Sequence, residues 1–482
     1  MTEHSYSFGA QNRSAILREA SRSDFDLAII GGGITGAACL RDAAQRGMRA
    51  ILFERDDFAA ATSGYSSKLI HGGLRYLETG DLRLVYESLR ERSILLATAP
   101  QWVRPLPFLY PVYSGHDRAL WKVTAGVYLY HLLTGFRGDV PGPSRLSPAQ
   151  TFMIEPRLLR EGLRGAVRYY DAQTSDVDLT LATVFTGWTH GGLACNHAKV
   201  VRLLEDAGAV RGVRVRDQLT QETYDIRATR IIHATGPFSD LTHRELLGDA
   251  TPRLRMTKGV HLILDEAFSP PTEAVLMISP RDQRVMFTLP WMGRTLVGTT
   301  DTDYEGDPTD AKATPHDIAY ILEAYNAYFP TAHATDKNVQ SSFAGIRPLI
   351  RQDKDSPSKV SREHQIDYDR PEVLSVIGGK LTSHRAMAEE ILDRLVRDTP
   401  GWKHRFSRGL TASSPLRETR RLDEGDLTPS EIQYAYLQEM AATPDDILFR
   451  RSKLAYLAPD RMKELRERCV QELARLGAPS QP

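Results

Sequence analysis

The chain has 482 residues, and its 61 basic and 61 acidic side chains give a formal net charge of zero. This length predicts two or more domains, and the balanced charge gives no indication of nucleic-acid binding. Cys39, Cys195 and Cys469 lie far apart, which argues against a disulfide framework and predicts no bound metal. The N-terminus is polar, and no apolar run reaches the roughly 18 residues of a spanning helix. We therefore expect a cytoplasmic protein.

Organised sequence begins after a polar leader, residues 1–23. The apolar run at residues 25–30 is typical of a buried parallel strand. A glycine-rich turn and a helix over residues 37–46 follow, and a second strand over residues 49–53 ends at Glu54. This strand–helix–strand unit predicts a Rossmann-like α/β domain.

The turn after the first strand has glycines at the spacing of a dinucleotide-binding motif, at Gly31, Gly33 and Gly36. The first glycine permits a tight turn, the second lets the backbone approach a pyrophosphate, and the third lets helix and strand pack closely. Glu54 lies 21 residues after Gly33, where a carboxylate accepts hydrogen bonds from ribose hydroxyls. The pattern predicts a dinucleotide site but does not distinguish NAD from FAD.

Two later segments favour FAD. An Ala-Thr-Gly turn at residues 234–236 follows a predicted strand at residues 230–233, as in many two-domain flavoproteins. A second glycine-rich turn, residues 377–380, precedes a helix over residues 383–396. Its backbone N–H groups and Lys380 suit the negative charge of a reduced flavin. Because an NAD-dependent dehydrogenase rarely returns to its nucleotide so late in the chain, we expect FAD.

Further strands and a helical C-terminal region complete the predicted architecture. The additional predicted strands are residues 210–215, 260–264, 285–289 and 295–297. After a segment rich in Arg, Ser, Thr and Pro, Thr428 and Thr443 are predicted helix N-caps, and a last helix covers residues 459–476. The predicted fold is a Rossmann-like FAD-binding domain with an interleaved α+β substrate domain and a small C-terminal helical domain. Its predicted divisions are the leader (1–23), the interleaved region (24–397), a linker (398–426) and the C-terminal domain (427–482).

Residues 61–78 resemble the FAD-dependent glycerol-3-phosphate dehydrogenases of the D-amino-acid-oxidase-like flavoprotein superfamily. The stretch Ser-Ser-Lys-Leu-Ile-His-Gly-Gly-Leu-Arg-Tyr-Leu, residues 66–77, is highly specific to that family. Further matches extend the resemblance over residues 25–396 and lie at 258–261, 290–292, 298–301, 345–349 and 378–382. The C-terminal helical domain is shorter than in the family, a departure that bears on dimerisation and membrane docking.

The resemblance implies oxidation of sn-glycerol 3-phosphate to dihydroxyacetone phosphate, with hydride transfer to N5 of non-covalent FAD and a quinone as acceptor. It leaves a homodimer open. Because a quinone lies in the bilayer, we expect peripheral contact with the cytoplasmic face of an anionic membrane. The predicted contacts are residues 119–133 and the arginines at 417, 420 and 421. A core helix is the favoured alternative for 119–133, because only Lys122 and His131 interrupt its apolar sequence.

The site residues follow from the chemistry and from the resemblance. A phosphate dianion requires several donors, and hydride removal requires a base, for which a neutral histidine is suited. We predict His261 as the base, with a core histidine as the alternative, and Arg347 and Lys380 as electrostatic stabilisers. The predicted substrate-binding residues are Arg75, Tyr76, Arg347, Arg362 and Lys380. The predicted cofactor-binding residues are Gly31, Gly33, Ile34, Thr35, Gly36, Glu54, Thr62, Ser63, Ser67, Lys68, Leu69, His71, Gly72, Gly73, Ala234, Thr235, Gly236, Gly345, Gly379, Lys380, Leu381 and Thr382.

Three other functions stay open at this point. A glycerol-3-phosphate oxidase uses oxygen and forms hydrogen peroxide, but that branch carries an inserted segment for which this chain has no obvious room. A related flavin oxidoreductase that acts on an amino acid or hydroxy acid needs fewer cations than a phosphate requires. A non-catalytic flavin-binding protein has no need of Arg75, His261, Arg347 and Lys380 together.

Overall fold

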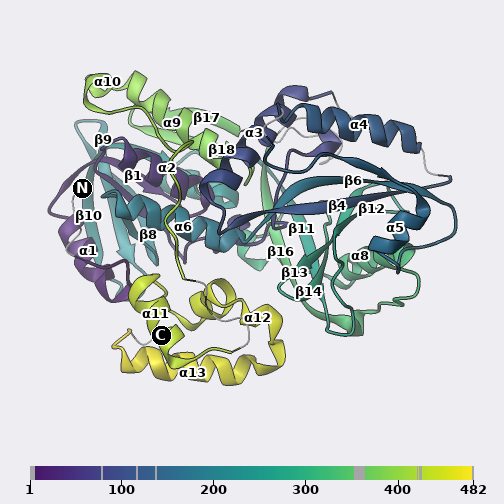
Figure 1. Cartoon of the computed structure of the whole chain (residues 1–482). Helices are drawn as coiled ribbons and strands as arrows, with labels where there is room; N and C mark the ends of the chain where they lie inside the picture. Colours follow the sequence, from purple (N-terminus) through teal and green to yellow (C-terminus); the bar gives the residue numbers. More distant parts are fainter. Residues whose placement is uncertain are drawn as a thin grey trace. The chain divides into compact units, whose positions relative to one another are not determined.

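The computed structural model describes residues 6–77, 80–115, 118–135, 138–351, 364–420, 422 and 426–479. The chain forms two compact units (Figure 1). Unit 1 comprises residues 1–64, 176–257 and 346–482, and unit 2 comprises residues 65–175 and 258–345. Each unit is therefore assembled from segments that are distant in the sequence.

Unit 1 contains a mostly parallel sheet with the strand order β17-β18-β10-β1-β2-β7. Strands β18, β10, β1, β2 and β7 run parallel, whereas β17 is antiparallel to β18 and the β8–β9 pair extends β10. The strands are β1 (Asp24–Ile30), β2 (Ala50–Phe53), β7 (Leu193–Cys195), β8 (Ala198–Asp206), β9 (Ala209–Asp217), β10 (Thr223–His233), β17 (His364–Arg370) and β18 (Val373–Gly378). The predicted Rossmann-like sheet is confirmed.

The central strands of this sheet are apolar throughout because both of their faces are covered. Side chains alternate along β1, so Leu27 and Ile29 pack on one face and Ala28 and Ile30 on the other. The first face is covered by α2 (Ile34–Gln45), α6 (Asp176–Thr189) and α9 (His384–Asp398), and the second by β8, β9 and α1 (Arg13–Ala20). The glycine turn therefore begins from a rigid strand.

The first residues of the chain differ from the predicted loose leader. Residues 10–12 form a 3₁₀ turn, and α1 packs Ile16, Leu17 and Ala20 into unit 1. These apolar residues are spaced as one side of a helix within an otherwise polar sequence. The polar composition concealed this short amphipathic pattern.

Unit 2 is built on a mixed sheet with the order β15-β11-β14-β13-β12-β4-β6-β3, to which β16 adds at β11 and β5 at β6. Its core lies between this sheet and α8 (Pro315–Tyr328). The strands are β3 (Leu69–Ile70), β4 (Val103–Tyr113), β5 (Ser144–Leu146), β6 (Leu163–Thr174), β11 (Leu254–Leu264), β12 (Ala274–Ile278), β13 (Val285–Trp291), β14 (Arg294–Gly298), β15 (Thr302–Asp303) and β16 (Val339–Ile350). Each strand predicted in the two sheets lies within an observed strand, except that the strand predicted at residues 49–53 starts one residue before β2.

Three further helices belong to unit 2: α3 (Leu82–Thr98), α4 (Leu120–Leu132) and α5 (Pro148–Ile154). The expectation of a core helix at residues 119–133 is wrong, because α4 buries one side only. Val123, Val127 and Tyr130 are buried, whereas Trp121 is 66% and Leu132 is 52% exposed. Each helix in the described residues is too short or too polar to cross a bilayer.

The C-terminal helices pack around an apolar core of their own within unit 1 (Figure 1). The predicted cap at Thr428 is confirmed, because its hydroxyl and Glu431 form a capping box. Between α9 and these helices lies a short helix, α10 (Trp402–Arg405); α7 (Ser239–Leu247) follows β10. The C-terminal elements are α11 (Pro429–Gln438), the π-helical segment η8 (Asp446–Arg451), α12 (Leu454–Leu457) and α13 (Met462–Arg475).

Candidate functional site

The predicted site residues gather in two groups, one within each unit. In unit 1, the glycine turn connects β1 to α2. Gly31 has a φ of +110°, and a Cβ there would lie 2.4 Å from the carbonyl oxygen of Ala234. A Cβ on Gly36 would lie 1.9 Å from the carbonyl oxygen of Gly31. The first and third glycines are therefore required by the backbone itself.

Gly33 is different, because it lies at the open end of the turn. It precedes α2 in extended conformation, and the nearest neighbours of a Cβ there would be atoms of Ser63, at 3.0 and 4.0 Å. The N–H of Ile34 donates to the Ser63 hydroxyl at 2.9 Å. Free N–H groups and the helix dipole at such a helix start suit an anionic pyrophosphate, so these residues fit a dinucleotide.

Glu54 follows β2 and is held by backbone donors. Its carboxylate accepts hydrogen bonds from the N–H groups of Gly32 at 2.6 Å and Asp56 at 2.9 Å. Burial raises the pKa of Glu54 to about 7, although these hydrogen bonds oppose the shift. The side chain is therefore fixed at the glycine turn, where an acceptor for ribose hydroxyls is expected.

The Ala-Thr-Gly turn, residues 234–236, is oriented by a buried histidine. His233 contacts the hydroxyl of Ser375 through Nδ1 at 2.9 Å and that of Thr235 through Nε2 at 2.8 Å. Burial lowers the pKa of His233 to about 4, so the imidazole is neutral at physiological pH. His233 thus acts as a structural hydrogen-bonding residue beneath a predicted cofactor segment.

The remaining predicted residues of unit 1 lie on β16 and after β18. The hydroxyl of Thr62 donates to the carbonyl of Ile346 at 2.5 Å, next to Arg347 on the same strand. Gly379 has a φ of +93°, which favours glycine. Leu381 lies between the predicted site residues Lys380 and Thr382. Its carbonyl oxygen lies 2.7 Å from Nδ1 of His384.

In unit 2, His261 lies on β11 on the side of the sheet that faces away from the α8 core. Val260, Leu262 and Leu264 belong to that core, and side chains alternate along a strand. His261 Nε2 lies 2.9 Å from the Ser67 hydroxyl, and the imidazole stacks on Phe343 with ring centroids 4.9 Å apart. The histidine is only 2% exposed. The structure therefore joins His261 to the Ser67 segment and not to the apolar core.

The segment after Ser67 has an unusual backbone. Lys68 has a φ of +59°, which costs a residue other than glycine on the order of 1 kcal/mol. Its ammonium lies 4.8 Å from the centre of the Phe343 ring, the ring on which His261 stacks. Leu69 then enters β3, which pairs with β6. Lys68 and His261 thus contact one aromatic side chain, and His261 also contacts Ser67.

The His71–Gly73 turn is held by a buried hydrogen-bond network that sequence reasoning missed. The N–H of Gly72 donates to the Tyr130 hydroxyl at 2.7 Å, and this hydroxyl donates to Asp171 at 2.9 Å. Arg92 donates to the same carboxylate at 2.8 Å. A Cβ on Gly72 would lie 2.6 Å from the Tyr130 oxygen. Charged residues at buried positions of α3 and β6 were the available signal.

The other predicted residues complete the description of unit 2. Gly73 has a φ of +76° and accepts a hydrogen bond from the N–H of Tyr76 at 2.8 Å. At Gly345 a Cβ would lie 2.5 Å from the carbonyl of Tyr65. Arg75 lies on the 3₁₀ turn at residues 74–77, but its side chain, like the whole of Arg362, lies outside the described part of the chain.

Sequence comparisons agree with this geometry. The profile of the family described as FAD dependent oxidoreductase matches residues 26–394, and that of the C-terminal domain of alpha-glycerophosphate oxidase matches residues 386–478. The aerobic glycerol-3-phosphate dehydrogenase of Staphylococcus haemolyticus is 33% identical over 96% of this chain and 93% of that protein. The protein of the same name from Bacillus subtilis is 37% identical over 82% of this chain and 70% of its own.

Solved structures show the same fold. The glycerol-3-phosphate dehydrogenase from Bacillus halodurans complexed with FAD superposes with a TM-score of 0.78 at 27% identity and covers 98% of this chain and 95% of its own. The FAD-bound L-alpha-glycerophosphate oxidase from Mycoplasma pneumoniae shares the fold, with a TM-score of 0.61 at 18% identity over 79% of this chain and 97% of its own. The chain therefore belongs to the family of FAD-dependent oxidoreductases, in the branch of the aerobic glycerol-3-phosphate dehydrogenases.

Proposed function

We propose that this protein oxidises sn-glycerol 3-phosphate to dihydroxyacetone phosphate with non-covalently bound FAD. The observation that carries the proposal is the placement of His261 beside Ser67, within the segment most specific to the family. The names of the relatives and the match to the FAD-dependent family support the substrate and the cofactor. An amino-acid or hydroxy-acid substrate finds less support, because those names specify a phosphorylated alcohol.

When bound, FAD supplies the hydride acceptor at N5. In this proposal, the start of α2 binds the pyrophosphate and Glu54 accepts hydrogen bonds from ribose hydroxyls. His261 accepts the proton of the C2 hydroxyl on its imidazole. Its low exposure keeps water away from that proton transfer. Arg347 and Lys380 bind the phosphate and stabilise the developing alkoxide.

The decisive test is anaerobic titration of the purified flavoprotein. Glycerol 3-phosphate is expected to bleach the flavin absorbance, whereas glycerol, lactate and amino acids are not. Bleaching by a carboxylated compound but not by glycerol 3-phosphate would show that the proposed substrate is wrong. Hydrogen peroxide formed stoichiometrically in air would favour the oxidase reaction over the dehydrogenase reaction. Acid precipitation tests the binding mode, because non-covalent FAD leaves the protein pellet colourless.

The phosphate contact is tested separately with Arg347→Ala. Loss of a charge-assisted hydrogen bond to the phosphate costs about 1.5–3 kcal/mol, so KM for glycerol 3-phosphate is expected to rise by roughly tenfold or more. The ratio of kcat/KM for glycerol 3-phosphate to kcat/KM for glycerol should fall by the same factor. Arg397→Ala is the control, because that side chain is 70% exposed in the same unit. Unchanged discrimination between glycerol 3-phosphate and glycerol would remove Arg347 from the phosphate site.

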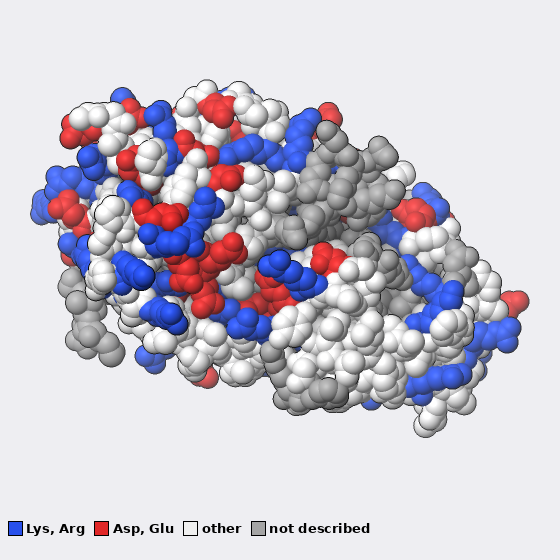
Figure 2. All heavy atoms as spheres, turned by 90° about the horizontal axis from the view of Figure 1, so that it is seen from above, with Lys and Arg blue, Asp and Glu red and all other residues white. Residues whose placement is uncertain are grey.

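We further propose that the electrons pass to a quinone at a membrane surface and that α4 contacts the lipid. The apolar exposed side of this helix supports the contact, and its side chains are Trp121, Tyr128, Leu129 and Leu132. Basic and acidic side chains both occur across the face seen in Figure 2, so apolar insertion is expected to contribute more than attraction to anionic lipid. Arg417 and Arg420 are exposed in unit 1, whereas Arg421 lies outside the described residues. A homodimer stays a prediction from the resemblance.

Vesicle binding tests this proposal. The protein should sediment partly with anionic vesicles at low salt, and quinone reduction should rise when vesicles are added. Replacing Trp121 and Leu132 by serine should reduce binding by roughly thirtyfold, since each exposed apolar side chain contributes on the order of 1 kcal/mol. Met153→Ser is the matched control, because Met153 is 84% exposed on α5. Equal reduction of a soluble dye and a quinone analogue without vesicles, and no sedimentation, would favour a soluble acceptor.

A further inference from the structure

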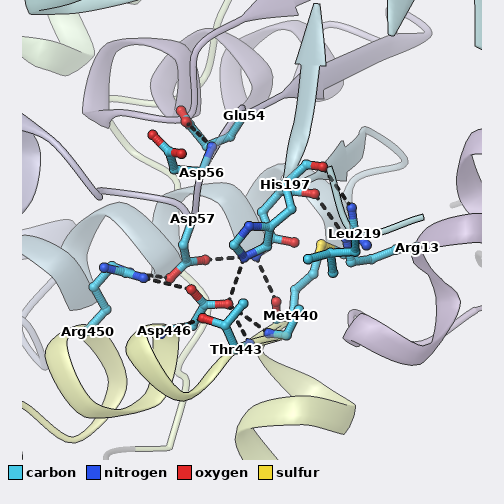
Figure 3. A network of polar contacts seen from close by, with 12 residues as sticks. Arg13, Glu54, Asp56, Asp57, His197, Leu219, Met440, Thr443, Asp446 and Arg450 are labelled. Carbon is cyan, nitrogen blue, oxygen red and sulfur yellow. Dashed lines mark hydrogen bonds and ion pairs between the residues drawn. The ribbon is translucent and has the colours of Figure 1, made fainter. Parts of the chain in front are cut away.

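The loop that follows Glu54 is fixed by buried charges from the C-terminal end of unit 1. Asp57 is fully buried in this loop. Arg451 donates to its two carboxylate oxygens at 2.6 and 3.0 Å, and Arg450 donates to Oδ2 at 2.6 Å. Figure 3 shows Asp57 facing Arg450, on the same loop as Glu54 and Asp56. A segment near the end of the chain thus contacts the loop of the first βαβ unit.

A second buried carboxylate completes this group. Asp446 accepts hydrogen bonds from Arg450 at 2.7 Å and from the N–H groups of Ala442 and Thr443 at 2.8 and 3.0 Å. Its Oδ2 also lies 2.8 Å from Nε2 of His197 (Figure 3). We call this group the Asp57 cluster; its members are Asp57, His197, Asp446, Arg450 and Arg451.

The same loop is bound to the predicted cofactor residues on its other side. The N–H of His197 donates to the carbonyl of Asp56 at 2.6 Å, and the N–H of Asp56 donates to Glu54 at 2.9 Å. Two residues after Asp57, the N–H of Ala59 donates to the carbonyl of Gly32 at 3.2 Å. A displacement of Asp57 therefore moves a backbone that contacts both Glu54 and the glycine turn.

We propose that Asp57 is a positioning residue for Glu54, and that η8 sets the affinity of unit 1 for the adenosine part of FAD through the Asp57 cluster. Without Arg451, Asp57 keeps Arg450 and the side-chain amide of Asn196, which donates to Oδ1 at 2.8 Å, but it loses the arginine that binds both of its oxygens, and the loop must move to hydrate the buried carboxylate. That movement takes the Asp56 N–H away from Glu54 and loosens the acceptor for the ribose. The inference rests on the FAD binding proposed above and goes beyond it by assigning a cofactor role to the C-terminal helices.

The test is FAD affinity in the full-length apoprotein, measured by quenching of flavin fluorescence. Arg451→Met is expected to raise the Kd for FAD by roughly tenfold, which corresponds to the loss of one charge-assisted contact. Arg461→Met is the matched control, because Arg461 lies in the same helical region but its side chain is 38% exposed. The control should change Kd by less than about twofold.

A second background separates positioning from general loss of structure. If Asp57 acts through Glu54, Arg451→Met should change Kd by less than about twofold in a Glu54→Gln protein. Equal weakening in both backgrounds would indicate a merely structural role and overturn the inference, as would an unchanged Kd in Arg451→Met. If Arg451→Met does not fold, Arg450→Met gives the same test, because Arg450 also donates to Asp57. Failure of the wild-type apoprotein to bind FAD would instead refute the proposed function.

Discussion

The two groups of site residues are built from different parts of the polypeptide. In unit 1 the proposed cofactor site consists largely of backbone, because Gly31 and Gly36 leave no space for a side chain and N–H groups hold Glu54. In unit 2 the proposed chemical site consists of side chains, with His261 fixed by contacts to Ser67 and Phe343. A site made of backbone fails when a side chain is added, whereas one made of side chains fails when a functional group is removed. Each half can therefore be broken separately.

The largest effect is expected from adding a methyl group to the backbone site. Gly36→Ala places a Cβ against the carbonyl oxygen of Gly31, so it should destabilise the protein by about 3 kcal/mol or more and abolish FAD binding. Thermal unfolding and flavin content measure the two losses. Gly33→Val should remove FAD while the fold persists, because the atoms nearest a Cβ there, at 3.0 and 4.0 Å, belong to the small side chain of Ser63.

Gly47→Ala is the control for these substitutions. Gly47 also has a positive φ, of +86°, but a Cβ there meets open space among the described residues. It should cost only about 1 kcal/mol and leave FAD binding intact. Wild-type stability and flavin content in Gly36→Ala would show that the turn does not depend on that glycine.

The next effect is expected in the side-chain site. His261→Asn removes the proposed base, so kcat should fall by about 10²- to 10⁴-fold while the Kd for FAD stays near its wild-type value. Stopped-flow measurement of flavin reduction gives the rate of the chemical step directly. A parallel loss of FAD would instead mean that His261 supports the cofactor, and the contrast between the two halves would disappear.

A smaller effect is expected from Tyr130→Phe, which removes the hydroxyl that accepts a hydrogen bond from the backbone N–H of Gly72. The variant leaves the N–H of Gly72 and the Asp171 carboxylate without the hydroxyl, at a cost of about 1–3 kcal/mol in the free energy of unfolding. Urea unfolding measures this cost. Flavin reduction should slow only a few-fold, because the variant displaces the His71–Gly73 turn but removes no reacting group. An unchanged free energy of unfolding would show that this hydrogen-bond network does not stabilise the fold.

The smallest effect is a pH dependence at Glu54. Its pKa is raised to about 7 in the folded apoprotein, so the unfolded chain releases this proton at lower pH than the folded one. The apoprotein should therefore lose stability between about pH 4.5 and pH 7, by about 1 kcal/mol at most, because solvent screens this partly exposed carboxylate. Glu54→Gln has no titrating group at this position. The free energy of unfolding of the variant, relative to that of the wild-type apoprotein, should therefore increase as pH rises. Parallel pH profiles for the two apoproteins would contradict the assignment.

Local patterns made much of unit 1 predictable. The glycine spacing, the apolar run of β1 and the Thr428 cap each occupy a few neighbouring residues, and each formed as expected. The surface position of α4 was not predictable, because its exposed side is as apolar as its buried side. The networks around Tyr130 and Asp57 were also missed. Arg451 is 394 residues from Asp57, and no periodicity within either segment indicates such a pairing.

The discontinuous sheet of unit 1 has a consequence for how the protein is made. Strand β1 leaves the ribosome well before its partner β10, which follows about 200 residues later. At about 5–20 residues per second, β1 stays without this neighbour for roughly 10–40 seconds. The arginines that bind Asp57 emerge later still, more than 200 residues after the end of β10. The nascent chain therefore carries an unpaired apolar strand edge until β10 is made, and the buried charges of Asp57 are paired only after η8 has been made.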